Sequence, residues 1–92
     1  MSNTDRMERI RQRLEAELAP RHLDIRDDSH LHAGHPGARD GRGHFHVTIL
    51  SDAFAQQRTL ARHRLVFKAL GDMMETDIHA LQIDARAPDE LT

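Results

Sequence analysis

Two segments that alternate apolar and polar side chains limit the fold of this chain most strongly. Residues 44–50, HFHVTIL, have apolar side chains at every odd-numbered position, and residues 79–86, HALQIDAR, alternate in the same way. The intervening pattern is helical, and a helical connection is what two parallel strands require. We therefore expect these strands to pair in parallel, with the connecting helices packed on one face of the sheet.

Two further elements are expected before these strands. Apolar side chains recur at spacings of three and four through residues 4–18, which predicts an amphipathic helix. A polar side chain at its start would cap it: Asn3, Thr4 or Asp5. Residues 22–27, HLDIRD, alternate and predict a half-buried strand. Because a loop joins this strand to the next one, we expect the two to be antiparallel.

Two helices are expected between the last two strands. A short helix is predicted from a cap at Ser51 or Asp52 to about residue 57. A longer helix over residues 59–77 would be capped by Thr59, and Gly71 should weaken its second half. The apolar face of the longer helix comprises Leu60, Leu65, Val66, Ala69, Leu70, Met73 and Met74.

The element order is therefore α-β-β-α-α-β, which predicts a two-layer α/β (α+β) sandwich with a three-stranded mixed sheet. We expect a single domain over residues 1–92, since the chain is short and contains neither an internal repeat nor a linker. Pro88 should end the last strand and leave a tail over residues 88–92.

Residues 28–43 lack any apolar period and are rich in glycine, which predicts a long, mobile loop between the first two strands. The loop contains His30, His32 and His35. Their H-x-H-x-x-H spacing is compatible with a transition-metal site, and it is also compatible with solvated loop side chains.

The expected parallel pairing places two more histidines near that loop. His44 begins one strand and His79 begins its parallel neighbour, so both should lie at the same edge of the sheet, where the loop ends. We expect the loop histidines and His79 to converge there. His44 and His46 would support such a site or lie on an exposed strand face.

Composition excludes several classes of function. The chain has no cysteine, which excludes thiol catalysis, disulfides and cysteine ligation by the chain itself. No apolar run is long enough to span a membrane and no signal-peptide pattern is present, so we expect a cytoplasmic protein without a membrane partner. The chain shows no nucleophile with a base, no phosphate-binding loop and no paired-carboxylate cleft, and we therefore expect no enzymatic activity.

The polar side of the longer helix is basic. It has two interpretations, a solvated helix face or a surface that contacts phosphates or an acidic partner. The net charge of −2 and the absence of Tyr and Trp argue against nucleic-acid binding. The residues of this candidate nucleic-acid or partner surface are Arg58, Arg62, His63, Arg64 and Lys68.

Four motifs, in this order, resemble the BolA-like proteins. They are DDSHLHAGH (27–35), GHFHVTILSDAF (43–54), RHRLVFKAL (62–70) and IHALQI (78–83). The resemblance extends from about the first helix to Pro88. It implies a class II KH-like fold, which has the element order inferred above from periodicity.

The resemblance also implies a function that depends on a partner. BolA-like proteins bind monothiol glutaredoxins and share a bridging [2Fe–2S] cluster with them, in iron–sulfur trafficking or iron sensing. The glutaredoxin supplies its active-site cysteine and a glutathione thiol. The alternative is a DNA-binding transcriptional regulator of stress response and cell morphology, which would use the basic helix.

By the same resemblance, the histidine of the IHAL motif, His79, is a cluster ligand. The second ligand comes from the loop, where His32 is the nearest match and His35 is its rival. Neutral imidazole is a competent iron ligand, and histidine ligation raises the potential of a cluster relative to cysteine ligation. Acid should weaken the site, because protonated imidazole cannot coordinate.

Overall fold

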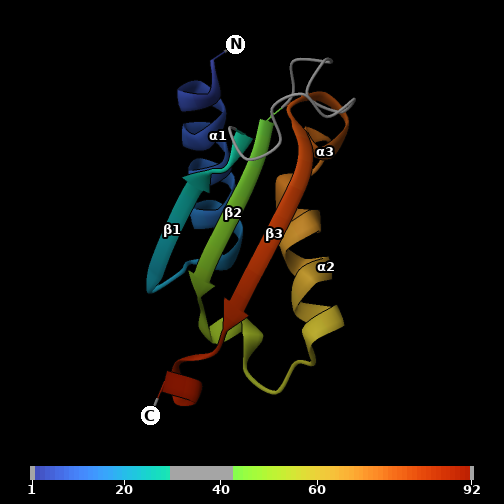
Figure 1. The fold of residues 1–92 in the computed structure, drawn as a ribbon. Helices are drawn as coiled ribbons and strands as arrows, with labels where there is room; N and C mark the ends of the chain where they lie inside the picture. Colours follow the sequence, from blue (N-terminus) through green and yellow to red (C-terminus); the bar gives the residue numbers. More distant parts are fainter. Residues whose placement is uncertain (1, 30–42, 92) are drawn as a thin grey trace.

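The structure is a computed structural model, and it describes residues 2–29 and 43–91 (Figure 1). The elements in chain order are α1 (Asn3–Leu18), β1 (His22–Asp27), β2 (Gly43–Leu50), the 3-10 turn η3 (Asp52–Phe54), α2 (Thr59–Leu70), α3 (Met73–Thr76), β3 (Ile78–Arg86) and the 3-10 turn η4 (Pro88–Leu91).

The three strands form one mixed sheet in the order β1-β2-β3. β1 and β2 are antiparallel, with His22 opposite Leu50, and β2 and β3 are parallel, as the periodicity predicts. Both long helices, α1 and α2, lie on the same face of the sheet, and the other face is uncovered by any described helix (Figure 1). The expected two-layer mixed α+β fold is confirmed.

The core lies between the sheet and the helices. Phe45, Val47 and Ile49 of the central strand are almost completely buried, and they pack in one cluster with Ile10 and Leu14 of α1. Each such side chain contributes about 1.5–3 kcal/mol by leaving water. The alternation of β2 therefore places three large apolar side chains in the core between the sheet and the helices.

The helix ends differ from those predicted. The N-cap of α1 is Ser2, whose Oγ accepts a hydrogen bond from the Asp5 amide at 3.1 Å, so the prediction of Asn3, Thr4 or Asp5 is wrong by one residue or more. The N-cap position of α2 is occupied by Arg58 without a side-chain bond, and Thr59 is the first helical residue.

The expected long helix over residues 59–77 is two helices. α2 ends at Leu70, and Gly71 follows with φ of 60°, a left-handed value that glycine adopts at little cost. The predicted short helix is a single 3-10 turn that ends at Phe54. Leu60 was expected on the apolar face, but 62% of it is exposed, because it lies in the first turn of α2, beyond the core cluster.

Ser51 joins the end of β2 to the end of α1. Its hydroxyl is fully buried, donates to the Leu18 carbonyl at 2.6 Å and accepts from the Ala53 amide at 3.1 Å. Ser51 is thus the N-cap of η3, one of the two predicted cap positions. It also satisfies a carbonyl at the C-terminus of α1 that has no partner within the helix.

Asp77 joins the opposite end of α1 to the start of β3. Its buried carboxylate accepts hydrogen bonds from Arg9 at 2.7 Å, from the Thr76 hydroxyl at 3.0 Å and from Arg6 at 3.4 Å. Burial alone would raise the pKa of Asp77, but the Thr76 hydrogen bond and the two guanidinium groups lower it overall. The anion is therefore favoured in the folded state, and it ties two elements that are far apart in sequence.

We expect Ser51→Ala to lower the free energy of unfolding by about 1–2 kcal/mol, because it leaves a buried carbonyl without its donor and removes a cap. Urea unfolding followed by circular dichroism measures the change. Thr4→Ala removes an exposed hydroxyl from α1 and should change the stability little. Equal effects of the two substitutions would contradict the role assigned to Ser51.

We expect Asp77→Asn to destabilise the fold by about 2 kcal/mol at pH 7, because two guanidinium groups lose their shared anion. The folded-state pKa of Asp77 lies below its unfolded value, so its contribution is present above about pH 4 and is lost as the pH falls through the folded pKa. The difference between wild type and variant should therefore narrow in acid.

Unfolding curves at pH 7, 5 and 3 would measure that narrowing. Asp72→Asn is the matched control, because the Asp72 side chain is 67% exposed and pairs with Arg13 at 3.4 Å at the surface. Such exposed ion pairs contribute little to the free energy of unfolding. A stability difference between wild type and Asp77→Asn that stays constant from pH 7 to pH 3 would refute the linkage.

Candidate functional site

The parallel pairing of β2 and β3 brings two histidines together at one edge of the sheet. The rings of His44 and His79 have their centroids 4.9 Å apart, with a tilt of 53° between their planes. His44 is 5% exposed, whereas His79 is an exposed residue. The prediction that both begin neighbouring strands at the same edge is confirmed.

A β-bulge sets the direction of His79. Gly43 is opposite Ile78, but the next residue of β2, His44, is already opposite Ala80, so His79 is an extra residue in β3. Because of the bulge, both Ile78 and Leu81 face the core. They are three residues apart, and in a regular strand two residues at that separation would face opposite sides of the sheet. His79 consequently reaches the exposed edge instead of the helix-covered face.

His44 lies deeper than its strand position indicates. Alternation along β2 assigns His44 to the sheet face without helices. On that face we expected either a supporting role for His44 or an exposed side chain. The structure shows that the side chain is buried. It lines a cavity of about 70 Å³ together with Asp28 and Gln82. That volume suits water or a single small group and excludes an organic cofactor. A strand pattern reports which face a side chain is on, but it does not report how deeply that face is covered.

Backbone bonds at the strand starts hold the two histidines in place. The Gly43 amide donates to the Asp77 carbonyl at 3.0 Å, and the His44 amide donates to Ser29 Oγ at 3.1 Å. A side chain at Gly43 would collide with the Phe45 ring, with contacts as short as 2.4 Å. Sequence reasoning missed both residues. Ser29 lies within the DDSHLHAGH motif, where only the histidines were considered, and Asp77 lies outside all four motifs.

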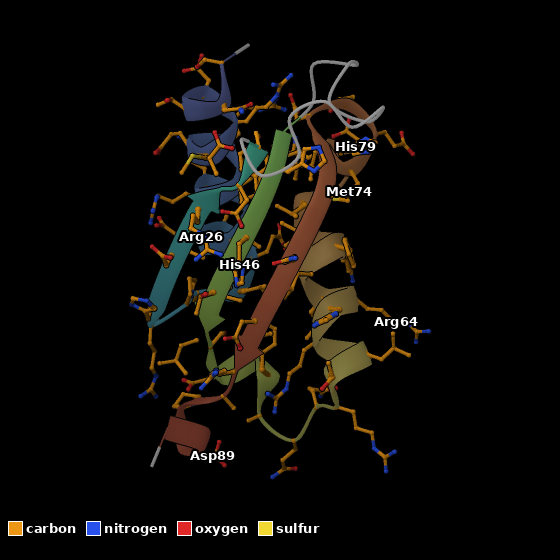
Figure 2. The ribbon with its side chains drawn as sticks, in the orientation of Figure 1. Arg26, His46, Arg64, Met74, His79 and Asp89 are labelled. Atoms are coloured by element: carbon orange, nitrogen blue, oxygen red, sulfur yellow. The ribbon has the colours of Figure 1, made fainter. Side chains whose placement is uncertain are left out.

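His46 lies two residues further along β2, away from this edge and near the middle of the sheet (Figure 2). Its Nδ1 is 3.2 Å from Nη2 of Arg26, which also forms a two-point ion pair with Asp28 at 2.8 and 3.2 Å. A guanidinium group can only donate, so the Nδ1 atom of His46 accepts in this contact. His46 therefore belongs to a polar cluster on the open face, and Asp28 of that cluster lines the cavity beside His44.

The predicted loop ligands His32 and His35 lie outside the described residues, as does His30. Within residues 2–29 and 43–91, no group of three or more histidine or carboxylate side chains is placed to hold a metal ion. No helix in the described parts of the chain is long and apolar enough to cross a membrane.

The basic residues of α2 differ from one another in their surroundings. Arg62 donates to the Gln57 carbonyl at 2.8 Å and to the Ala85 carbonyl at 3.0 Å. It therefore ties α2 to β3, an outer strand of the sheet. Arg58, Arg64 and Lys68 are exposed, and Arg64 points away from the molecule (Figure 2). None of these three forms an ion pair with another described residue. His63 is half-buried, and the apolar side chains of Leu60 and Phe67 are exposed on the same helix.

Comparison with known proteins finds relatives of similar sequence. The chain is 43% identical over 88 residues to SufE-like protein 1, chloroplastic/mitochondrial, of Arabidopsis thaliana, a match that covers 90% of this chain and 24% of that protein. It is 40% identical over 89 residues to protein BOLA1, chloroplastic, of the same plant, covering 94% of this chain and 56% of that protein. The chain thus spans about a quarter and about half of the length of these curated relatives. Their names refer to organelles, and the cytoplasmic location expected for this chain stays a prediction.

A solved structure, the BolA domain of SufE1 from Arabidopsis thaliana, superposes with a TM-score of 0.82 at 42% identity, covering 94% of this chain and 95% of that one. The family model described as BolA-like protein matches residues 14–90, which include both His44 and His79. The resemblance noted in four sequence motifs therefore extends to the whole fold, and the chain belongs to the BolA-like protein family.

Proposed function

We propose that this chain is a non-enzymatic adaptor of iron–sulfur trafficking or iron sensing, which binds a monothiol glutaredoxin and shares a bridging [2Fe–2S] cluster with it. The observation that carries the proposal is the exposed imidazole of His79 on a bulge, beside buried His44 at the sheet edge. An exposed ligand at an edge is accessible to a group that is held by another protein. The name of the SufE-like relative is in keeping with a role in iron–sulfur metabolism.

The donor groups fit such a cluster. The chain has no cysteine, so imidazole is its only side chain with an established affinity for a bridged iron–sulfur cluster. His79 would be one ligand, and His32 or His35 would be the second. The glutaredoxin would supply its cysteine and a glutathione thiol. A bound cluster would accept and release an electron, or pass intact between proteins, and this chain's part is to present neutral imidazole nitrogen at a fixed place.

We expect a cluster-loaded monothiol glutaredoxin to change its visible absorption and circular dichroism when it is mixed with this protein. His79→Ala should abolish or strongly reduce the change, because one iron ligand is lost. His22→Ala is the matched control, since it removes an exposed histidine at the opposite end of the sheet, where β1 begins opposite Leu50.

Identical responses of wild type and His79→Ala would refute the ligand assignment. His32→Ala and His35→Ala in the same titration would decide which loop histidine contributes. Lowering the pH should reverse the spectral change, because a protonated imidazole cannot bind iron.

The second candidate function is DNA binding by α2. It is favoured by Arg58, Arg64 and Lys68, which are exposed along one helix and are not engaged with described acidic residues. The exposed apolar side chains of Leu60 and Phe67 on the same helix, and the net charge of −2, argue against strong DNA binding by this surface. Arg62 was predicted for the same surface, but its two bonds to backbone carbonyls make it an unsuitable probe, since its loss would also disturb the fold.

If DNA is the ligand, Arg64→Ala and Lys68→Ala should each weaken retention of duplex DNA and lower the slope of log K against log salt concentration by about one. Arg11→Ala is the control, because it removes the same charge from α1, where Arg11 pairs with Glu15 at 3.7 Å. A duplex that is not retarded by wild-type protein even at low salt would exclude this function.

A further inference from the structure

Asn3, the first residue of α1, lies beside the end of β1. Its Nδ2 donates to Asp27 Oδ2 and to Ser29 Oγ, both at 3.1 Å. Its Oδ1 accepts from Nη1 of Arg6 at 3.0 Å. The helix itself does not require this side chain, because Ser2 already caps α1.

One side of this amide leads to His44. Ser29 Oγ accepts both from Asn3 and from the backbone amide of His44, at 3.1 Å each. The Ser29 amide in turn donates to Asp27 Oδ1 at 2.9 Å. The His44 amide thus bonds to a hydroxyl that also accepts from Asn3, on a residue whose own amide is bound by Asp27. The His44 carbonyl separately accepts the Asp28 amide at 2.8 Å.

The other side of the amide leads to His79. Arg6 donates to Asn3 through Nη1 and to the Asp77 carboxylate through Nε, at 3.4 Å for the second contact. Asp77 is two residues before His79, and its carbonyl accepts the Gly43 amide at 3.0 Å. Arg6 and Asp77 therefore connect Asn3 to the start of the bulged strand.

Only a carboxamide suits this position among side chains of this size. It donates to the anion of Asp27 and accepts from the cation of Arg6 at the same time. An aspartate could accept from Arg6, but it could not donate to Ser29, and it would repel Asp27. An alanine would break both sides of the connection.

We propose that Asn3 is a positioning residue for the His44–His79 pair, acting through Ser29 on one side and through Arg6 and Asp77 on the other. The expected effect of Asn3 on the positions of the two rings is inferred from the hydrogen bonds described above. Its consequence for cluster binding rests on the proposed function.

The test uses Asn3→Ala and Asn3→Asp in the full chain, observed by NMR. Cross-relaxation between the His44 and His79 ring protons reports their separation, and hydrogen exchange of the His44 amide reports its bond to Ser29. We expect weaker cross-relaxation and about five- to tenfold faster exchange at His44, with exchange at the core amides of Val47 and Ile49 unchanged.

Two companion variants separate positioning from a general loss of stability. Ser29→Ala should reproduce the effect at His44, and Ser29→Thr, which keeps the hydroxyl, should restore wild-type behaviour. Gln12→Ala is the matched control, since it removes an exposed amide whose hydrogen bond, to Glu8 at 3.4 Å, stays within α1. Unchanged rings and an unchanged His44 amide in Asn3→Ala would overturn the proposal, and so would a uniform rise in exchange across β2.

A second measurement keeps this proposal distinct from the proposed function. In the glutaredoxin titration, Asn3→Ala should give a circular dichroism spectrum that differs from wild type, whereas Gln12→Ala should not. If wild type itself gives no spectral response, the proposed function fails, and the NMR result alone decides whether Asn3 positions the rings. If wild type responds and Asn3→Ala gives the same spectrum, positioning of the cluster ligands is refuted.

Discussion

The pairing of β2 with a strand on each side is the constraint on which the rest of the structure depends. β2 pairs with antiparallel β1 on one side and with parallel β3 on the other. Both registers are therefore set by one segment of eight residues. Its apolar face supplies the platform for both long helices. Its first residues stand at the edge where His44 meets His79. The core and the candidate site are therefore two consequences of the same strand.

Periodic patterns predicted the parts of this fold that repeat. The bounds of β1 are those expected, and those of β2 and β3 differ from expectation by one residue, because alternation along a half-buried strand is visible in single side chains. The helix caps were harder to predict. Ser2, Asn3, Thr4 and Asp5 are all competent caps, and only the structure shows that Ser2 has the required extended backbone. Gly71 was recognised as a weak point, but the pattern of apolar side chains continues past it, and so one helix was expected instead of two.

The site was predictable in outline and not in detail. Parallel pairing alone brings His44 and His79 to one edge, and family motifs point to His79. The bulge could not be predicted from the sequence, because Ile78 and His79 are equally compatible with a regular strand. The bonds from Arg6 and Arg9 to Asp77 join residues that are separated by 71 and 68 positions, and no local rule links them. Such long-range polar contacts are decided by the packing of α1 against the sheet.

The extra residue in β3 has a consequence for how this segment can evolve. A substitution near the bulge changes one side chain, whereas loss of one residue between Asp77 and Ala80 would restore a regular ladder. Either the strand downstream would then turn its apolar side chains away from the helices, or the segment before it would leave the core. The number of residues between Asp77 and Ala80 therefore decides which side chains of β3 face the helices, whereas a single substitution there leaves that choice unchanged.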